Sequence, residues 1–411
     1  MRSAPAPAAP RHPSAPRHRR RTALAATGLV AALALTATAC GGAEKDETDA
    51  KPSGATSQAA GTGDTGDGKV QLPADLADRL KEHGIDVDQW KDGGWKDWDK
   101  DKWLSEAKDF VNPVIEGLWK PDRMRAAKEA DKTVTTKDTA ADRGATDPEP
   151  APVEAVAEKT PYHDNAAPVG KVFFDGPEGS MVCSGTVIKD ANHPGRSNLV
   201  WTAGHCVHAG GSGGWYRNIA FVPSYNDLGK SEAELAGATT TEMAPYGTWW
   251  ADWAATSNQW IEGGAENGGD GAAYDYSVLH VKPEQGSKSL EETVGAALEV
   301  DFSAPSAAEV ADMGAWGYPA APPYNGLTMF KCVDRPGRLS LSPSLPTMYR
   351  IGCTMTGGSS GGGWFRVVDG ETKLVSNTSI GPLDNTWLAG PQLGPEAEAM
   401  YQNMSRTYGG Q

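Results

Sequence analysis

The sequence predicts an all-β fold of the antiparallel sandwich or barrel type, with a C-terminal helix and a small helical module before it. Short apolar runs separated by glycine, proline and asparagine fill the chain from residue 169 onward, as expected for antiparallel strands. Helical periodicity returns only at 395–408, whereas in 73–125 apolar residues recur at three- and four-residue steps. The predicted strands are 171–174, 181–188, 198–202, 218–222 and 276–281.

The first 39 residues have the features of an export signal, because a cluster of arginines at 17–21 precedes an uncharged run rich in alanine and leucine. Ala37-Thr38-Ala39 fits ordinary signal cleavage, whereas the same residues followed by Cys40 resemble a bacterial lipobox. Lipidation of Cys40 would also account for the odd cysteine of the chain. We therefore favour a surface lipoprotein exported from a bacterial cell, with a soluble secreted protein or an uncleaved membrane anchor as alternatives.

The charge of the chain bears on its partners. The 411 residues carry a net charge of −15, and removal of the signal, which holds six arginines and no acid, would change it to −21. Such an acidic protein repels the phosphate backbone, so nucleic acid is not an expected partner.

Three segments lie between the signal and the β-rich half. Residues 40–68 are small and polar, which predicts a flexible tether with a mean span of roughly 30 Å. Residues 69–130 form the helical module, in which Pro113 should kink the second helix and Pro121 should end it. Its position makes it a candidate pro-region that assists folding or blocks the site. Residues 131–165 are polar and rich in proline, which predicts a linker and a place for proteolytic maturation.

Four tryptophans of the helical module allow two interpretations. They are Trp90, Trp95, Trp98 and Trp103, interleaved with lysine and aspartate. A carbohydrate-binding platform would expose them, whereas a small domain with little else to bury would pack them, which we favour. If the tryptophans form such a platform, the chain could be a cell-wall-binding protein in which the β-rich half serves as a scaffold.

The other four cysteines, Cys183, Cys206, Cys332 and Cys353, match no zinc-binding spacing. In an exported protein they should form disulfides rather than remain reduced. Three pairings exist, of which the local one joins Cys183 to Cys206 and Cys332 to Cys353, across separations of 23 and 21 residues. Each such bridge would stabilise the fold by roughly 3 kcal/mol in the chain-entropy model.

A glycine-rich stretch at 356–363 displays two serines. Five of its eight residues are glycine, which lets the backbone approach a ligand closely. Ser359 and Ser360 each have glycines two residues away on both sides, so spacing alone does not choose between them. A flexible linker has the same composition, and a serine becomes a nucleophile only with a histidine base that an acid orients.

His205 is the candidate base, because it directly follows a strand-like run and precedes a cysteine that would hold it in place. The competing histidines in this half, His163, His193, His208 and His280, have no equally constrained setting.

Asp275 is the candidate acid, because it heads an apolar strand where a carboxylate could be buried against an imidazole. Asp270 is the alternative, although it lies among glycines. The order His205, Asp275, Ser360 excludes the α/β-hydrolases, in which the histidine follows the serine, and subtilisin, in which the aspartate precedes the histidine. It selects the chymotrypsin-like arrangement.

These residues lie in four motifs that resemble those of the trypsin-like serine endopeptidases. The motifs are Cys183-Ser184-Gly185-Thr186-Val187, Thr202-Ala203-Gly204-His205-Cys206, Asp275-Tyr276-Ser277-Val278-Leu279 and Ser359-Ser360-Gly361-Gly362. Gly317-Tyr318-Pro319 and the 356–362 stretch are similar to the bacterial glutamyl-endopeptidase (V8-like) branch. The resemblance covers residues 165–390 and implies a protease domain over 166–411, built from two six-stranded β-barrels with the site between them.

The resemblance also implies the roles of the site residues. Ser360 would attack the scissile carbonyl, His205 would transfer the proton, and Asp275 would orient the imidazole. The backbone N–H groups of Gly358 and Ser360 would form the oxyanion hole. The substrate would be a peptide or protein, the chain would be a monomer, and no metal or cofactor would be needed.

The sequence departs from the family at several positions. Ser359 replaces the aspartate that pairs with a freed N-terminus in trypsin-type zymogens, so that activation switch is not expected. Thr354 occupies the pocket floor, followed by Met355 and Thr356, and the absence of an acid there argues against cleavage after arginine or lysine. No histidine lies near Ser360 to bind a glutamate side chain.

The sequence therefore predicts a secreted or surface-anchored serine endopeptidase that works through a Ser/His/Asp triad and an acyl-enzyme. The alternative is a catalytically silent protein of protease fold that binds envelope proteins or the cell wall.

Overall fold

The structure is a computed structural model that describes residues 70–71, 110, 112, 114–130, 132–135, 145–211 and 213–409. The predicted export signal, Cys40, the tether and the four tryptophans of the helical module lie outside these residues. None of the helices in the described part of the chain has the length and hydrophobicity of a membrane span.

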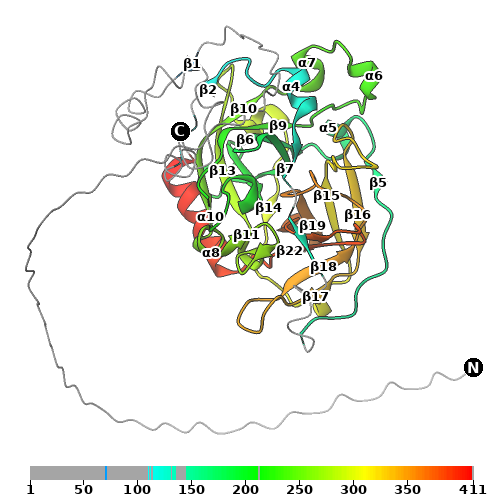
Figure 1. Cartoon of the computed structure of the whole chain (residues 1–411). Coiled ribbons are helices and arrows are strands. Elements are labelled where there is room, and N and C mark those ends of the chain that lie inside the picture. The colour runs from blue at the N-terminus through cyan, green and yellow to red at the C-terminus, as the bar shows by residue number, and fades with distance from the viewer. Residues whose placement is uncertain are drawn as a thin grey trace, which may run out of the picture. The chain divides into compact units, whose positions relative to one another are not determined.

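Six antiparallel strands of the described residues close into a barrel (Figure 1). They pair in the order β7, β6, β9, β10, β13 and β8, and the pairing of β8 with β7 completes the circle. The strands are β6 (Val169–Gly176), β7 (Gly179–Ile188), β8 (Leu199–Thr202), β9 (Arg217–Pro223), β10 (Trp249–Thr256) and β13 (Ser277–Pro283). We call this unit the first barrel, and it confirms the predicted all-β class.

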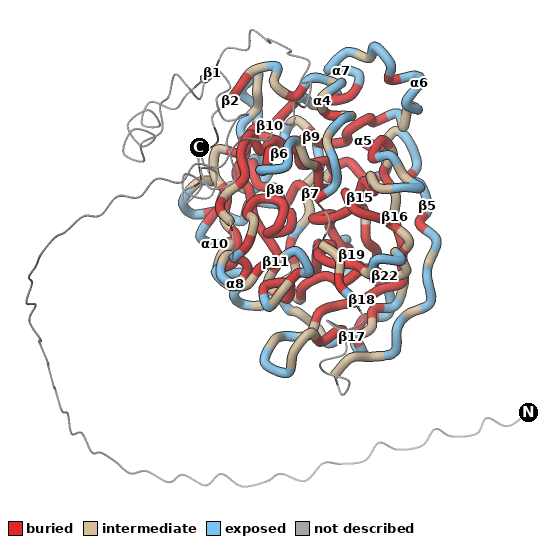
Figure 2. The backbone as a smooth tube through the Cα atoms, in the orientation of Figure 1, coloured by how far each residue is buried: buried red, intermediate tan, exposed pale blue. Residues whose placement is uncertain are grey.

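The first barrel contains all five strands that the sequence predicts. Apolar and β-branched side chains fill its interior, and Figure 2 shows most of these strands as buried. Strand β10 was not among the predicted strands, because a bulge between Ala251 and Trp253 interrupts the alternation by which half-buried strands are recognised.

The second half of the β-rich region consists of two sheets around one core. The first sheet has the order β14 (Glu299–Val300), β20 (Glu371–Asn377), β19 (Gly363–Val368), β15 (Met313–Gly317), β16 (Phe330–Asp334) and β5 (Val156–Ala157). The second has the order β17 (Gly337–Leu339), β18 (Met348–Gly352) and β22 (Trp387–Gly390). Side chains of both sheets, including Ala315, Trp364, Ile351 and Leu388, share one hydrophobic cluster. We call this unit the C-terminal half.

Two disulfides are present, Cys183–Cys206 in the first barrel and Cys332–Cys353 in the C-terminal half. They confirm the local pairing of the four cysteines. The second bridge joins β16 of one sheet to the residue that follows β18 of the other, so it links the two sheets covalently.

Residues 146–158, within the predicted linker, lie along the C-terminal half and touch both of its sheets. Asp147 forms an ion pair of 2.8 Å with Arg338 of β17, whereas β5 pairs with β16. Glu158 forms an ion pair of 2.9 Å with Lys331 of β16. We call residues 146–158 the strap.

The described part of the predicted helical module differs from the expectation. Val114–Ile115 forms strand β2, which pairs with β1 (Val70–Gln71), and the described residues 110–135 are helical only in α4 (Pro121–Ala126). Pro121 was expected to end a helix; instead it begins one, because a proline at the first helical position lacks only an N–H that would have had no partner. Two further strands follow, β3 (Lys128–Glu129), parallel to β7, and β4 (Thr133–Val134).

The described residues of this predicted helix pack on the first barrel instead. Trp119 is 1% exposed and donates its indole N–H to the carbonyl of Asn218 at 2.9 Å. Asn112 exchanges two hydrogen bonds with the backbone of Ile219, in β9. The apolar spacing therefore marked a buried segment, but the partner surface decided its conformation.

The predicted C-terminal helix is present as α10 (Pro395–Tyr408). Its Tyr401 donates to the carbonyl of Lys189 at 2.9 Å, and Tyr408 stacks on Trp253 with ring centroids 4.5 Å apart. The remaining elements are α5 (Tyr162–Asn165), α6 (Glu232–Leu235), α7 (Thr240–Met243), α8 (Asn258–Gly263), α9 (Leu290–Val294), η2 (Gly204–Cys206), η3 (Ala272–Tyr274), η4 (Ala307–Glu309), β11 (Gly264–Ala265), β12 (Gly268–Gly269) and β21 (Gly381–Pro382).

Candidate active site

His205 lies on the short turn η2, directly after strand β8 of the first barrel. The next residue, Cys206, is bonded to Cys183 of β7, so a covalent bridge fixes the turn to the barrel wall. Trp260 packs beside the imidazole with ring centroids 5.9 Å apart, and both residues are fully buried. The ring is therefore held through its backbone and by contact with one aromatic neighbour.

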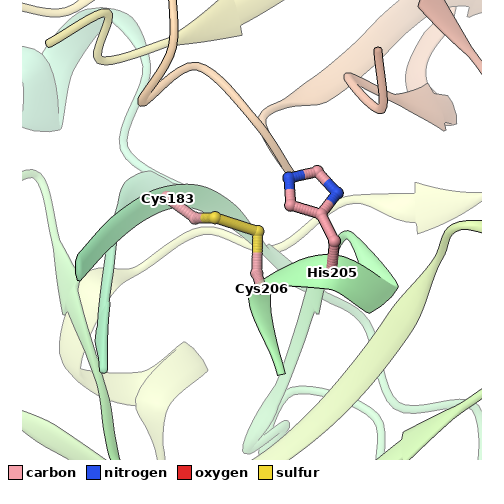
Figure 3. A group of neighbouring side chains, drawn as sticks. All are labelled: Cys183, His205 and Cys206. Carbon is pink, nitrogen blue, oxygen red and sulfur yellow. A yellow bond between two sulfur atoms is a disulfide. The ribbon is translucent and has the colours of Figure 1, made fainter. Parts of the chain in front are cut away.

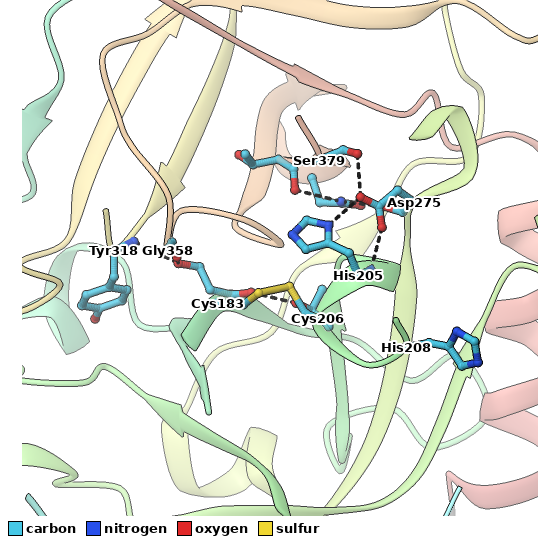
Figure 4. Close-up of a disulfide and its surroundings, with 12 residues drawn as sticks. Cys183, His205, Cys206, His208, Asp275, Tyr318, Gly358 and Ser379 are labelled. Carbon is cyan, nitrogen blue, oxygen red and sulfur yellow. Dashed lines mark hydrogen bonds and ion pairs between the residues drawn. A yellow bond between two sulfur atoms is a disulfide. The ribbon is translucent and has the colours of Figure 1, made fainter. Parts of the chain in front are cut away.

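Asp275 lies between η3 and β13 and contacts His205 twice (Figure 4). Its Oδ2 lies 2.7 Å from Nδ1 of His205, and its Oδ1 accepts the backbone N–H of the same residue at 2.8 Å. Ser379 donates its hydroxyl to Oδ2 of Asp275 at 2.6 Å. Asp275 is fully buried, whereas the alternative Asp270 is exposed. This geometry places the proton of the imidazole on Nδ1 and leaves Nε2 as the acceptor.

The two serines of the glycine-rich stretch have different surroundings. Ser359 donates its hydroxyl to the carbonyl of Thr356 at 2.7 Å, within its own turn. Ser360 is 1% exposed, and its Oγ has no hydrogen-bond partner among the described residues. Nε2 of His205 is likewise buried without a partner there. A buried polar atom without a partner costs free energy. Nε2 of His280 is another such atom, so the lack of a partner at His205 gains its meaning from the serine loop that packs beside it.

Close backbone packing brings the serine loop to the histidine. The backbone N–H of Ser184, next to the disulfide, donates to the carbonyl of Ser360 at 2.7 Å. A Cβ on Gly361 would collide with the side chain of Thr202 and would lie 2.9 Å from the backbone nitrogen of Ala203, two residues before His205. Gly361 has a φ of 76°, so both its conformation and its surroundings require glycine.

The surroundings of Gly358 fit an oxyanion hole. The carbonyl of Gly357 accepts the N–H of Ala320 at 2.6 Å, and because the peptide is planar and trans, the N–H of Gly358 points the opposite way. Neither that N–H nor the one of Ser360 has an acceptor among the described residues. Gly358 has a φ of 93°, and a Cβ there would lie 2.7 Å from the carbonyl oxygen of Tyr318. Two backbone donors are thus left available beside Ser360.

The residues predicted to line the specificity pocket are engaged within the C-terminal half. Thr354 accepts the N–H of Ala155, in the strap, at 2.9 Å, and Met355 is fully buried. Thr356 donates its hydroxyl to the carbonyl of Ala321 at 2.8 Å. Their role in specificity stays a prediction.

The competing histidines show that a histidine–aspartate pair is not specific by itself. His163, His193 and His280 lie 2.7, 3.0 and 2.5 Å from Asp227, Asp190 and Asp252, respectively. His208 is 4% exposed, and burial lowers its pKa to about 4. What distinguishes His205 is the serine loop packed against the residues just before it.

Cys183, His205 and Cys206 offer ligand atoms of metal-binding type within 4.8 Å of one another (Figure 3). The two sulfur atoms are bonded to each other as a disulfide. A cysteine binds zinc as a thiolate, so this group does not fit a metal ion.

Sequence reasoning missed Ser379 and Trp260. Both lie far from the triad motifs along the chain, and the fold alone brings them to Asp275 and His205. A serine in a stretch of serine, asparagine, threonine, glycine and proline carries no signal of its own.

No protein-family model and no curated protein matches this chain. Solved structures do. A thermostable serine protease AL20 from an extremophilic microorganism is 31% identical over 60% of this chain and 99% of its own, with a TM-score of 0.48. The protease Anisep from Arthrobacter nicotinovorans is 30% identical over 61% of this chain and 99% of its own, with a TM-score of 0.48. A Glu endopeptidase in complex with MPD is 14% identical over 63% of this chain and 99% of its own, with a TM-score of 0.42. All three structures carry the names of proteases, and this chain spans 99% of the length of each.

Proposed function

We propose that this chain is an exported serine endopeptidase in which Ser360, His205 and Asp275 form the catalytic triad. The observation that carries the proposal is the arrangement of Asp275 and His205, joined at 2.7 Å, with an unpartnered imidazole nitrogen and an unpartnered serine hydroxyl in the same buried site. His280 also pairs with an aspartate and has an unpartnered Nε2, so what sets His205 apart is the serine loop packed against the residues just before it.

The chemistry follows from these groups. Oγ of Ser360 attacks the carbonyl carbon of a peptide bond while Nε2 of His205 takes its proton. The negative charge that develops on the carbonyl oxygen is stabilised by the N–H groups of Gly358 and Ser360. His205 then gives its proton to the leaving amine, and a water molecule activated by the same nitrogen hydrolyses the acyl-enzyme. Asp275 is a positioning group that holds Nδ1–H and stabilises the imidazolium.

The finer assignments belong to the same proposal. Membership of the V8-like branch is supported by Gly317-Tyr318-Pro319, in which Tyr318 is fully buried and donates its hydroxyl to the carbonyl of Tyr225 at 3.0 Å. Thr354, Met355 and Thr356 carry no cation, which argues against selection of acidic side chains by these residues. Export is supported by the two disulfides, and we propose Cys40 as the lipidated residue.

The experiment that tests the proposal is covalent labelling with a fluorophosphonate probe. The probe is added to the purified full chain and to the form recovered after export. The variants Ser360→Ala and Ser359→Ala are treated in the same way. We expect labelling of the exported form of the parent and of Ser359→Ala but not of Ser360→Ala, because the Ser359 hydroxyl is bonded within its own turn whereas the Ser360 hydroxyl is not. Absence of labelling in every form, with near-UV circular dichroism showing intact tertiary packing, would overturn the proposal.

One observation favours the alternative of a catalytically silent protein of protease fold. Both reactive atoms, Oγ of Ser360 and Nε2 of His205, are closed to solvent. A silent protein would stay closed after maturation and would bind its partner without labelling at Ser360.

A further inference from the structure

The triad of the full chain is closed to solvent. His205 and Asp275 are fully buried and Ser360 is 1% exposed. An endopeptidase must admit a peptide to its serine, so the full chain is closed where a substrate would have to enter. Residues that lie next to the triad and that come from outside the β-rich half are therefore of interest.

Strand β4 pairs with β21 in a separate two-stranded sheet, close in the chain to Ser379. Thr133 pairs with Gly381 and Val134 with Pro382 in parallel, and the N–H of Gly381 donates to the carbonyl of Lys132 at 3.3 Å. Strand β21 begins two residues after Ser379, which donates to the carboxylate of Asp275. The edge that β4 covers thus belongs to the strand that follows Ser379, the residue that contacts Asp275.

Val134 fills an apolar site at the same place. It is 2% exposed and belongs to a cluster with Ala272 and Ala273, which precede Asp275, and with Ile380, which follows Ser379. Trp387 and Met348 of the three-stranded sheet belong to the same cluster. The side chain is therefore buried among residues adjacent in the chain to the groups that hold His205.

Backbone pairing and a side-chain pocket together are the means by which a sheet edge binds an extended peptide. One edge accepts one strand at a time. We propose that residues 132–135 are the built-in occupant of this edge, so that they exclude a peptide strand and keep the full chain latent. This inference rests on the proposed function, and it assigns the blocking role to residues 132–135 rather than to the helical module before them.

The anchoring of the preceding residues explains how so short a pairing holds. A two-residue strand is not stable by itself. The chain just before it is fixed to the first barrel, because Arg123 of α4 forms an ion pair of 2.7 Å with Asp175 of β6 and β3 pairs with β7. Because α4 and β3 are fixed to the first barrel, the effective concentration of residues 132–135 at the edge of β21 is high. Cleavage of the chain between β3 and residue 132 should therefore release residues 132–135. A side chain at position 134 that packs less well in the apolar cluster should do the same.

The test uses the full chain with Val134→Asp, beside Val156→Asp as the matched control. Val156 is 61% exposed, so the same substitution there removes no buried contact. We expect Val134→Asp to raise the initial rate of fluorophosphonate labelling about tenfold or more, since the charge shifts the population from the occupied to the open edge. The control should label at the parent rate, and Val134→Asp combined with Ser360→Ala should not label.

A peptide supplied from outside provides the second arm. A synthetic peptide of residues 130–137 should slow the labelling of Val134→Asp, whereas the same peptide with aspartate in place of valine should not. Equal labelling rates of the parent and Val134→Asp would overturn the inference while leaving the proposed function intact.

A third readout does not depend on activity. Hydrogen exchange of a peptic fragment that contains residues 379–382 should be faster in Val134→Asp than in the parent and in Val156→Asp, because the N–H of Gly381 loses its acceptor. Unchanged exchange would overturn the inference even in a protein that never labels. Faster exchange without any labelling would support the occupied edge and contradict the proposed function.

Discussion

The two halves that meet at the candidate site are held together in different ways. The first barrel, which carries His205 and Asp275, closes through its own strand pairing. The C-terminal half, which carries Ser360, consists of two separately paired sheets among the described residues. The strap and the Cys332–Cys353 bridge connect those sheets.

This difference teaches that the serine side of the site depends on chain that precedes the first barrel in the sequence. Asp147 of the strap accepts from Arg338 of β17 and offers its carbonyl to Arg350 of β18, whereas Glu158 pairs with Lys331 of β16. A fragment that begins at residue 166 would keep the closed first barrel, which carries His205 and Asp275. It would lose the strap that joins the two sheets of the C-terminal half.

The largest expected effect comes from removing the bridges, one half at a time. The double variants Cys332→Ala/Cys353→Ala and Cys183→Ala/Cys206→Ala should each lose about 3 kcal/mol of unfolding free energy, because their loops are nearly equal in length. Only the first should also show faster hydrogen exchange in β17, β18 and β22, since strand pairing keeps the first barrel closed without its bridge. If hydrogen exchange became faster to the same extent in the strands of both halves, the first barrel would depend on its bridge as much as the C-terminal half does, which would contradict the comparison.

A smaller effect, of opposite sign, is expected in the first barrel at Lys171. Its ammonium donates to the carbonyl of Gly326 at 2.8 Å and lies 4.5 Å from the ring centroid of Tyr225, and burial lowers its pKa to about 7. Below pH 7 both the folded and the unfolded chain carry this charge, so the full cost of burying it is present. As the pH rises from 7 toward the ordinary value of 10.5, the folded chain loses the proton first and the cost disappears.

Lys171→Met should therefore stabilise the protein by about 2 kcal/mol below pH 7, after the lost hydrogen bond and ring contacts are subtracted. The gain should vanish above pH 10.5. Urea unfolding at both pH values measures it, with Lys189→Met, at an exposed lysine, as the control. Destabilisation below pH 7 would show that the contacts of the ammonium outweigh its burial.

The smallest effect is expected at Glu158, in the strap. Burial by itself would raise the pKa of this carboxyl, but hydrogen bonds from Lys331, Trp316 and the N–H of Lys159 outweigh it and lower the pKa below its ordinary value of 4.5. The carboxylate therefore stabilises the fold above pH 4.5, and this contribution is lost as the pH falls through the lowered pKa.

Glu158→Gln should cost about 1 kcal/mol of unfolding free energy at neutral pH and nothing in strong acid, where the parent carboxyl is protonated as well. Glu154→Gln, at an exposed strap position, should have no effect. If Glu158→Gln leaves exchange in β16 unchanged at neutral pH, the ion pair does not help to fasten the strap.

Much of the fold and of the candidate site could be predicted because the relevant signals are local. Five strands of the first barrel and helix α10 have apolar periodicity within a few residues, and the local disulfide pairing joins cysteines close in the sequence. The order of His205, Asp275 and Ser360 predicted a triad, whose catalytic role stays a prediction. In the structure Asp275 contacts His205, and Gly361 of the serine loop packs against Thr202 and Ala203.

The sequence by itself determined which candidate catalytic side chains the chain contains, which residues are apolar and where the backbone needs glycine. Only the tertiary structure decided that Val114–Ile115 is a strand, that Ser379 donates to Asp275, and that Val134 lies buried in a cluster with Ala272 and Ile380. The physical reason is that these features depend on surfaces supplied by residues more than 40 positions away. Free energy from burial and from long-range hydrogen bonds is not visible in any local pattern, and it overrides local preference wherever the two differ.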